Sequence, residues 1–506
     1  MGHWHIQRLM PNAACRLRRR LSVELVCRFC ELFLLIKFSD MRQEHDFIGI
    51  KTIPPDAYWG VHTARAVENF PITGQTVAQM PALIRAFALV KKAAAHANLQ
   101  LGVINETQAS AISKACDDLM AGQLHEQFVT DVIQGGAGTS TNMNANEVIA
   151  NRALEHLGLP KGRYDVIHPN DHVNASQSTN DAYPTAVKLA TYFGIQTLLA
   201  ALVSLRGAFE AKAQAFAGIL KIGRTQLQDA VPMTLGQEFA AFAAMIADDE
   251  KRLRESSALM CEINLGGTAI GTGINAPVGY VDLVVHKLAE LSGVPVKAAS
   301  NLIAATADTG AFADISGIFK RIAVKLSKIS NDLRLLSSGP QAGVGDIQLP
   351  ARQAGSSIMP GKVNPVIPEV MNQVCFQVIG NDVAISMAAE AGQLQLNAFE
   401  PLIAWSLHQS LRHLSQACYT LQVNCVEGIV ANEALLNERI ASSVTLVTAL
   451  NPLIGYERAA SIAKAAIASG KPIAQVAEEL GILSQVEMKK LLVADKLTQV
   501  GALKVA

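Results

Sequence analysis

Long stretches of helical periodicity dominate the middle of the chain. Apolar side chains recur every three or four residues at Ile195, Leu198, Leu199, Leu202 and Phe209, and again at Ile315, Phe319, Ile322, Leu326, Ile329 and Leu333. Similar patterns run through residues 235–262, 368–391 and 399–430. The chain is therefore predicted to be mainly α, with five long helices, several of about 25 residues and roughly 40 Å. Their wide apolar stripes predict an elongated bundle that also packs against other copies of the chain, and hence an obligate oligomer.

The pattern changes on both sides of this bundle, which predicts three domains. Residues 41–177 mix short helices with loops, broken by Pro54-Pro55 and by glycines at 135–138. The bundle is expected to occupy residues 178–431. From 432 to 506 the helices shorten, with breaks at Asn451-Pro452 and around Gly470, which indicates a small C-terminal helical domain.

The first forty residues differ from the rest of the chain. Four arginines crowd positions 16–20, and no acid precedes Glu24. Charged residues interrupt the apolar run that follows, which argues against a secretory signal, and the run is too short to span a membrane. An Arg-rich transit peptide is one alternative. We expect instead that the functional chain begins at Met41 and that residues 1–40 are dispensable or disordered.

Composition narrows the classes of partner. Lys and Arg together number 43, as do Asp and Glu, so no net field attracts nucleic acid or an anionic membrane. Small molecules and copies of the chain itself are the expected partners. The eight cysteines lack metal-type spacing, apart from Cys27 and Cys30, which have no second pair. They indicate reduced thiols and a cytoplasmic protein.

The segment 338–365, SGPQAGVGDIQLPARQAGSSIMPGKVNP, lies between two helical patterns and is too rich in glycine and proline to form one regular element. Loops of this length inside compact domains are usually functional or disordered. Flexible backbone N–H groups and hydroxyls at Ser356 and Ser357, with the cation of Lys362 and the amide of Asn364, suit a substrate that carries carboxylates. The alternative is an ordinary polar connection with a surface lysine.

Three further clusters combine hydroxyls and amides with few charges. They are GGAGTSTN at 135–142, which includes Thr139 and Ser140, then Ser178-Thr179-Asn180-Asp181, and Gly223-Arg224-Thr225-Gln226. Hydroxyl residues before a helical pattern are also what any helix N-cap prefers, so the first two have that simpler interpretation. Taken together, the clusters favour a site that binds carboxylates by hydrogen bonds.

Two motifs point elsewhere but lack their required context. Gly271-x-Gly273-x-x-Ala276 matches a dinucleotide fingerprint, yet it follows a helical pattern without βαβ alternation. KPIAQVAEELGILS at 471–484 resembles a helix-turn-helix, but acids at 478 and 479 stand where phosphate contacts need cations. We expect no nucleotide site, and an ordinary helical hairpin at 471–484.

The run GSSIMPGKVNP at 355–365 is the signature of the fumarase/aspartase superfamily, and the chain resembles that family from about residue 47 to about residue 470. The stretches QGGAGTSTNMNANEVIAN, GRTQLQDAVPMTLGQEF, NLGGTAIGTGIN and NPVIPEVMNQVCFQVIGND are more similar to its ammonia-lyase branch than to class II fumarases. The resemblance implies three helical domains, a twenty-helix core in a homotetramer, and active sites that each draw on three chains.

The resemblance also implies a mechanism, the reversible deamination of L-aspartate to fumarate and ammonia. Ser356 would be the general base that removes a proton beside the side-chain carboxylate, giving an aci-carboxylate dianion. Thr139, Ser178 and Thr179 would stabilise that dianion and Lys362 would bind the other carboxylate. The ammonium would be held by Asn180, Thr225 and Asn364. Supporting positions would be Gln226, Glu369, Ser357 and Ser140.

The same resemblance implies that no metal or organic cofactor is required, although some members respond to divalent cations such as Mg²⁺. The polar run from His168 to Asp171 resembles the secondary site of fumarases. Gln226 stands where many fumarases, and some aspartases, have histidine. A hydroxyl leaves as water more easily when a side chain donates a proton to it. A substrate ammonium group already carries its proton and leaves as ammonia without such a donor, so Gln226 favours deamination.

Three other functions remain open at this stage. Fumarate hydration is the alternative within enzymes. A non-catalytic structural oligomer would be expected to lose Ser356 or Lys362, and both are present. A DNA-binding regulator is disfavoured by the neutral charge.

Overall fold

The computed structural model describes residues 41–491 and 493–498, which form two compact units. Of the described residues, one unit comprises 41–134 together with Thr139–Ser176, and the other comprises Gly135–Gly138 and those from Gln177 onward. Seventeen α-helices, α2 to α18, make up most of the described residues. The prediction of a mainly α protein is confirmed, whereas the calls on residues 1–40, including Cys27 and Cys30, lie outside the described residues.

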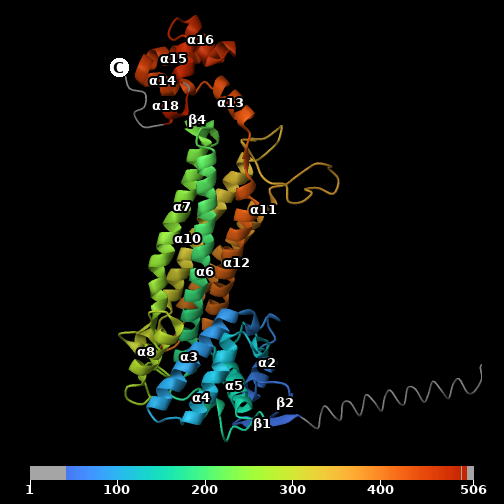
Figure 1. Cartoon of the computed structure of the whole chain (residues 1–506), viewed down its shortest axis with the longest axis vertical. Helices are drawn as coiled ribbons and strands as arrows, with labels where there is room; N and C mark the ends of the chain where they lie inside the picture. The colour runs from blue at the N-terminus through green and yellow to red at the C-terminus, as the bar shows by residue number, and fades with distance from the viewer. Residues whose placement is uncertain (1–40, 492, 499–506) are drawn as a thin grey trace, which may run out of the picture. The chain divides into compact units, whose positions relative to one another are not determined.

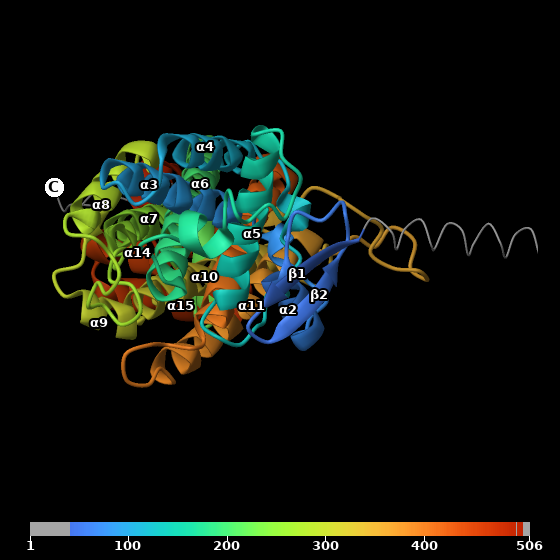
Figure 2. The same ribbon diagram turned by 90° about the horizontal axis from the view of Figure 1, so that it is seen from below.

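The first unit is a small helical assembly with a β-hairpin at its start. Its elements are β1 (Arg42–Asp46), β2 (Gly49–Ile53), α2 (Val61–Asn69), α3 (Pro81–Gln100), α4 (Glu106–Met120) and α5 (Thr139–His156). The strands pair in an antiparallel register with Arg42 opposite Ile53. Helix α3 packs against α4, and α4 against α5, burying alanines and Phe87 of α3 completely. Figure 2 shows α3, α4 and α5 of this unit.

Five long helices form the body of the second unit. They are α6 (Thr179–Ala215), α7 (Leu235–Ser256), α10 (Gly310–Leu336), α11 (Val366–Glu390) and α12 (Glu400–Asn424). They lie side by side, with α6 against α7 and α12, and α11 against α10 and α12 (Figure 1). The apolar positions that predicted α6 and α10, such as Ile195 and Ile322, are fully buried. The five-helix bundle is therefore confirmed.

Short strands and helices connect the bundle, and the sequence did not predict the strands. They are β3 (Leu220–Thr225), β4 (Gln228–Thr234), β5 (Glu262–Ile263), α8 (Tyr280–Ser292), β6 (Lys297–Ala298) and α9 (Leu302–Ala307). β5 and β6 are parallel and joined through α8, so the expectation of no βαβ unit is wrong. Each strand has only two residues, however, and Gly271 packs directly on the backbone of Ile303, where a Cβ would lie 2.4 Å from its Cα. That glycine is explained by close packing.

The C-terminal part of the second unit is built from short elements. They are β7 (Ile347–Gln348), β8 (Val430–Ala431), α13 (Glu433–Ser442), α14 (Leu446–Ile454), α15 (Tyr456–Ser469), α16 (Ile473–Glu479), α17 (Gln485–Leu491) and α18 (Ala494–Leu497). These helices surround a hydrophobic core of their own that also takes in Ile222 of β3. α16 and α17 pack as a helical hairpin, as expected for 471–484. A separate third domain stays a prediction.

Helix α6 is long and apolar enough to cross a membrane by length and composition alone. Half of its most apolar window is buried inside the protein, where α6 packs against α7 and α12. It is therefore a core helix of the bundle.

Candidate active site

The glycine- and proline-rich segment forms no long regular element, as predicted, and Ser356 lies in an irregular part of it. The Ser356 Oγ accepts hydrogen bonds from the backbone N–H groups of Ile358 at 3.1 Å and Met359 at 3.0 Å. Two donors on one hydroxyl oxygen stabilise its deprotonated form. Ser356 is half-buried, whereas its neighbour Ser357 is exposed.

The two ends of this loop are tied together. The Gly355 N–H donates to the Lys362 carbonyl at 2.7 Å, and the Asn364 side-chain amide donates to the Gly355 carbonyl at 2.8 Å. A Cβ on Gly355 would lie 2.8 Å from the Lys362 carbonyl oxygen, so only glycine fits. The result is a closed loop that presents Ser356 and the exposed ammonium of Lys362 on one short segment. Glu369 lies in the first turn of α11, directly after it.

Thr225 and Gln226 lie at the tip of the β3–β4 hairpin. Thr225 pairs with Gln228, and the two residues between them, Gln226 and Leu227, have φ of 52° and 63°. Tight hairpin turns of this type normally contain Asn or Gly, because other side chains are strained at positive φ. Such strain is common at functional sites, where the backbone must hold a side chain in one position. The Thr225 and Gln226 side chains at this turn are exposed.

Ser178, Thr179 and Asn180 begin helix α6. Ser178 is its N-cap and forms a capping box with Asp181, so the simpler interpretation of this cluster is confirmed. The Asn180 amide nitrogen donates to the Ala269 carbonyl at 2.7 Å, which leaves the amide oxygen as an acceptor. Asp181 accepts from the N–H groups of Gly266 and Thr268, fixing the NLGGT segment against the start of α6.

The clusters of the second unit occupy opposite ends of α6. The hairpin directly follows α6, and the Gly236 N–H at the start of α7 donates to the carbonyl of Phe216, the C-cap of α6. Arg224 of the hairpin pairs with Asp346 near the start of the loop segment. The β3–β4 hairpin and the loop between α10 and α11 thus lie at one end of the bundle and the start of α6 at the other (Figure 1). A 37-residue helix is about 55 Å long, so one chain cannot bring Asn180 to Ser356.

Thr139 and Ser140 lie in the first unit, at the start of α5. Both line a pocket of about 160 Å³ whose other walls include Arg65, His62 and Phe47. The Arg65 guanidinium pairs with both Asp46 oxygens, at 2.7 and 2.8 Å, and lowers the pKa of that carboxyl to about 2. The pocket therefore combines hydroxyls with a fixed ion pair.

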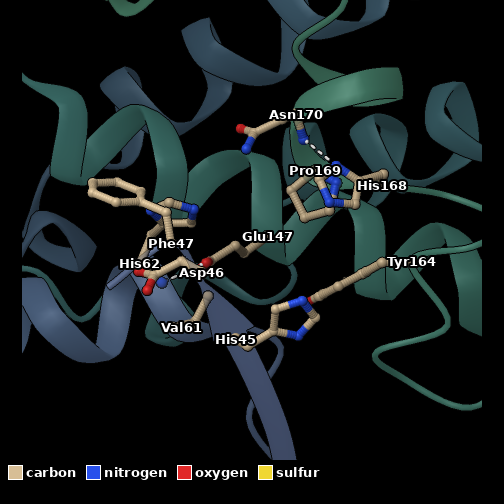
Figure 3. A pocket seen from close by; sticks show the side chains of 10 residues that line it. All are labelled: His45, Asp46, Phe47, Val61, His62, Glu147, Tyr164, His168, Pro169 and Asn170. Atoms are coloured by element: carbon tan, nitrogen blue, oxygen red, sulfur yellow. Dashed lines mark hydrogen bonds between the residues drawn. The ribbon is translucent and has the colours of Figure 1, made fainter. Parts of the chain in front are cut away.

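A second pocket of the first unit, of about 280 Å³, contains the His168-Pro169-Asn170 run (Figure 3). Figure 3 places Glu147 at its centre, between His62, His45 and Tyr164. Burial raises the pKa of Glu147 to about 7. Four hydrogen bonds to its carboxylate act in the opposite direction, and their donors are the N–H groups of Gly60, His62 and Thr63 and the Thr63 hydroxyl. Desolvation also lowers the pKa of His62.

Sequence reasoning missed the buried acids that hold these segments. Glu147 fixes the N-terminus of α2, Asp181 fixes the NLGGT segment, and Asp346 pairs with cations on separate elements. Only Asp181 had a sequence signal, since it stands three residues after the N-cap Ser178. Among the described residues, no group of three or more His, Cys, Asp or Glu side chains is arranged to hold a metal ion.

The second unit is thus a five-helix bundle that carries the Ser356 loop between α10 and α11. The family described as Lyase matches residues 49–380, and the chain belongs to it. A model described as Fumarase C C-terminus matches residues 446–499.

Curated relatives cover most of the chain. Proteins named aspartate ammonia-lyase from Pseudomonas aeruginosa, Helicobacter pylori and Escherichia coli are 57%, 56% and 51% identical. The alignments cover 91%, 88% and 89% of this chain and 97%, 96% and 94% of those proteins. The membership in the fumarase/aspartase superfamily that the motifs indicated is confirmed.

Solved structures share the fold. A Brucella melitensis protein described as fumarate lyase:delta crystallin bound to cobalt has a TM-score of 0.87 and 58% identity, over 89% of this chain and 98% of that one. A class II fumarase from Schistosoma mansoni has a TM-score of 0.84 at 36% identity, again over 89% and 98%.

Proposed function

We propose that this protein is an aspartate ammonia-lyase, which converts L-aspartate reversibly to fumarate and ammonia. The observation that carries the proposal is the identity of 51–57% to curated relatives of that name over about nine tenths of the chain. The protein would thus be a carbon–nitrogen lyase that acts on a small molecule.

In this proposal Ser356 is the general base. A serine hydroxyl is a poor base in water, because its alkoxide is strongly disfavoured. The N–H groups of Ile358 and Met359 lower that barrier by donating to Oγ, and the nearby Lys362 ammonium adds a favourable charge. Closure of the tied loop over the substrate would remove competing water.

The other predicted residues have roles that fit their polarity. Thr139, Ser178 and Thr179 would donate to the aci-carboxylate, with Ser140 and Ser357 in support, and Lys362 would bind the second carboxylate. Asn180 and Asn364 each use the amide nitrogen on a protein carbonyl, Ala269 and Gly355. Their amide oxygens are then the acceptors that an ammonium group requires, with Thr225 beside them.

We propose a homotetramer with active sites shared by three chains and a core of twenty helices. The length of α6 supports this arrangement, because it separates Asn180 from Ser356 within one chain. The bundle also leaves large apolar side chains of α11 exposed: Val370, and on one face of the helix Phe376, Val383 and Met387.

No cofactor is required by this chemistry, since the acid, base and anion-binding groups are all side chains or backbone amides. Activation by a divalent cation such as Mg²⁺ is compatible with it. We propose a cytoplasmic location and no nucleic-acid or membrane partner.

The test is the absorbance of fumarate when the purified protein receives L-aspartate or L-malate in separate reactions. Fumarate from aspartate alone supports the proposal. Fumarate from malate with aspartate untouched would instead identify a fumarate hydratase, the activity named for the Schistosoma relative. Inactivity toward both, with an intact oligomer, would favour the non-catalytic structural alternative.

A further inference from the structure

A fully buried carboxylate, Asp346, lies between three cations that come from two different elements. Its Oδ2 is 2.7 Å from Arg224 and 3.1 Å from Lys221, both on β3, and its Oδ1 is 2.7 Å from Arg439 on α13. Lys221 is also paired with Glu238 of α7 at 2.6 Å. Because a buried carboxylate must be fully paired, Asp346 fixes the relative positions of β3 and α13.

The same helix holds the root of the Ser356 loop. Arg439 donates from the same terminal nitrogen to the Val344 carbonyl, and the Asn432 side chain donates to the Gly345 carbonyl. The Asn432 N–H donates to the Asp346 carbonyl at 3.0 Å, and β7 pairs with β8 just before α13. The start of the loop, residues 344–348, is therefore anchored on residues 430–439.

Asp346 also contacts the β3–β4 hairpin close to its tip. Arg224 precedes Thr225, and its pairing with Asp346 is the ionic contact that holds this strand end against the loop root. Ile222 of the same strand is buried in the core of the C-terminal helices. The hairpin tip and the start of the loop are thus both held in position relative to α13.

We propose that Arg439 is a positioning residue for the elimination reaction, which acts through Asp346 and Val344 to set the loop that carries Ser356 relative to the hairpin that carries Thr225. The reaction itself rests on the proposed function. Arg439 does not reach the substrate in this arrangement. It defines where the loop starts, and small errors in the position of a catalytic group reduce turnover strongly.

The experiment compares Arg439→Met, Arg439→Lys and a matched control, Arg458→Met, in the full-length oligomer. Arg458 is an exposed arginine on α15. We expect Arg439→Met to lower kcat for L-aspartate about tenfold or more and to raise KM as well, because Ser356, Lys362 and Asn364 all lie on the loop that shifts. Since one terminal nitrogen makes both Arg439 contacts, Arg439→Lys should recover most of kcat. The control should match the wild type.

A second measurement does not depend on the reaction. Trypsin cleavage after the exposed Lys362, followed by mass spectrometry on the free protein, should be several times faster in Arg439→Met than in the wild type or the control. Unchanged kcat together with unchanged cleavage would overturn the proposal, as would equal losses in Arg458→Met. If the wild type makes no fumarate, the proposed function fails, and the cleavage rates alone decide the role of Arg439.

Discussion

The hydroxyl oxygen of Ser356 accepts a hydrogen bond from the backbone N–H of Met359 at 3.0 Å, within the same short loop. The proposed role of Ser356 as a base requires donors to this oxygen, and the folded loop supplies them from its own backbone. Because both donors are backbone N–H groups of the loop itself, which any side chain except that of proline leaves in place, the loop carries its own alkoxide stabilisation wherever it moves.

Replacement of Ser356 by alanine should therefore abolish deamination. Removal of the only proposed base leaves the bound substrate without a proton acceptor, and we expect kcat to fall by at least ~10³-fold. The oligomer and its thermal stability should be unchanged, because the side chain is only half-buried. Fumarate absorbance and gel filtration measure the two effects.

Ser357→Ala is the matched control for that experiment. Its side chain is exposed, and a loss below about tenfold is expected from a supporting role. If Ser357→Ala is the more damaging change, or Ser356→Ala keeps appreciable activity, Ser356 is not the base.

Gln226→His tests which group leaves. The positive φ of Gln226 suits histidine better than most residues, so the hairpin should tolerate the change. An imidazolium beside the leaving group can protonate the hydroxyl of malate as it departs, whereas the ammonium of aspartate departs without a proton donor. We expect aspartate turnover to fall less than about tenfold and slow malate dehydration to appear, rising as pH drops below ~6.5. Malate activity in the wild type equal to that of the variant would contradict this role.

Glu400 should make stability depend on pH. It is 3% exposed at the start of α12, and burial raises its pKa to about 8, with Lys188 opposing. The folded state then keeps a proton that the unfolded state releases above about pH 4.3, so stability falls as pH rises toward 8. Glu400→Gln removes this loss of stability at high pH. The variant should be more stable than the wild type by about 2–4 kcal/mol at pH 9, with little difference at pH 4.

Thermal unfolding at both pH values measures this difference, and Glu457→Gln, an exposed acid on α15, is the control. A Glu400→Gln variant that loses stability at pH 9 would show that the carboxylate is ionised and stabilising in the folded protein.

The helices of the bundle could be predicted because their signal is local. Ile195 and Ile322 repeat with the helical period, and Ser178 has the composition of an N-cap. The β3–β4 hairpin escaped prediction because its turn is Gln226-Leu227 and not the Asn-Gly that usually marks such a turn.

Long-range pairings were equally invisible. Asp346 is 122 residues from Arg224 and 93 residues from Arg439, and nothing in the spacing of these residues indicates that they meet. The loop could be recognised by its motif, but its anchorage on α13 required the folded chain. The assignment of catalytic roles still rests on the resemblance and on the experiments above.

The distance between Asn180 and Ser356 predicts complementation between inactive chains. Asn180 begins α6, which is about 55 Å long, and the Ser356 loop lies at its far end, so the proposed site must take the two residues from different subunits. Asn180→Ala and Ser356→Ala proteins should each be nearly inactive alone. After unfolding and joint refolding at equal amounts, random assembly gives each site both native residues with a probability of one half squared, and about a quarter of wild-type activity should return. Refolding each variant separately is the control, and failure of the mixture to exceed it, with tetramers formed, would show that Asn180 and Ser356 do not serve one shared site.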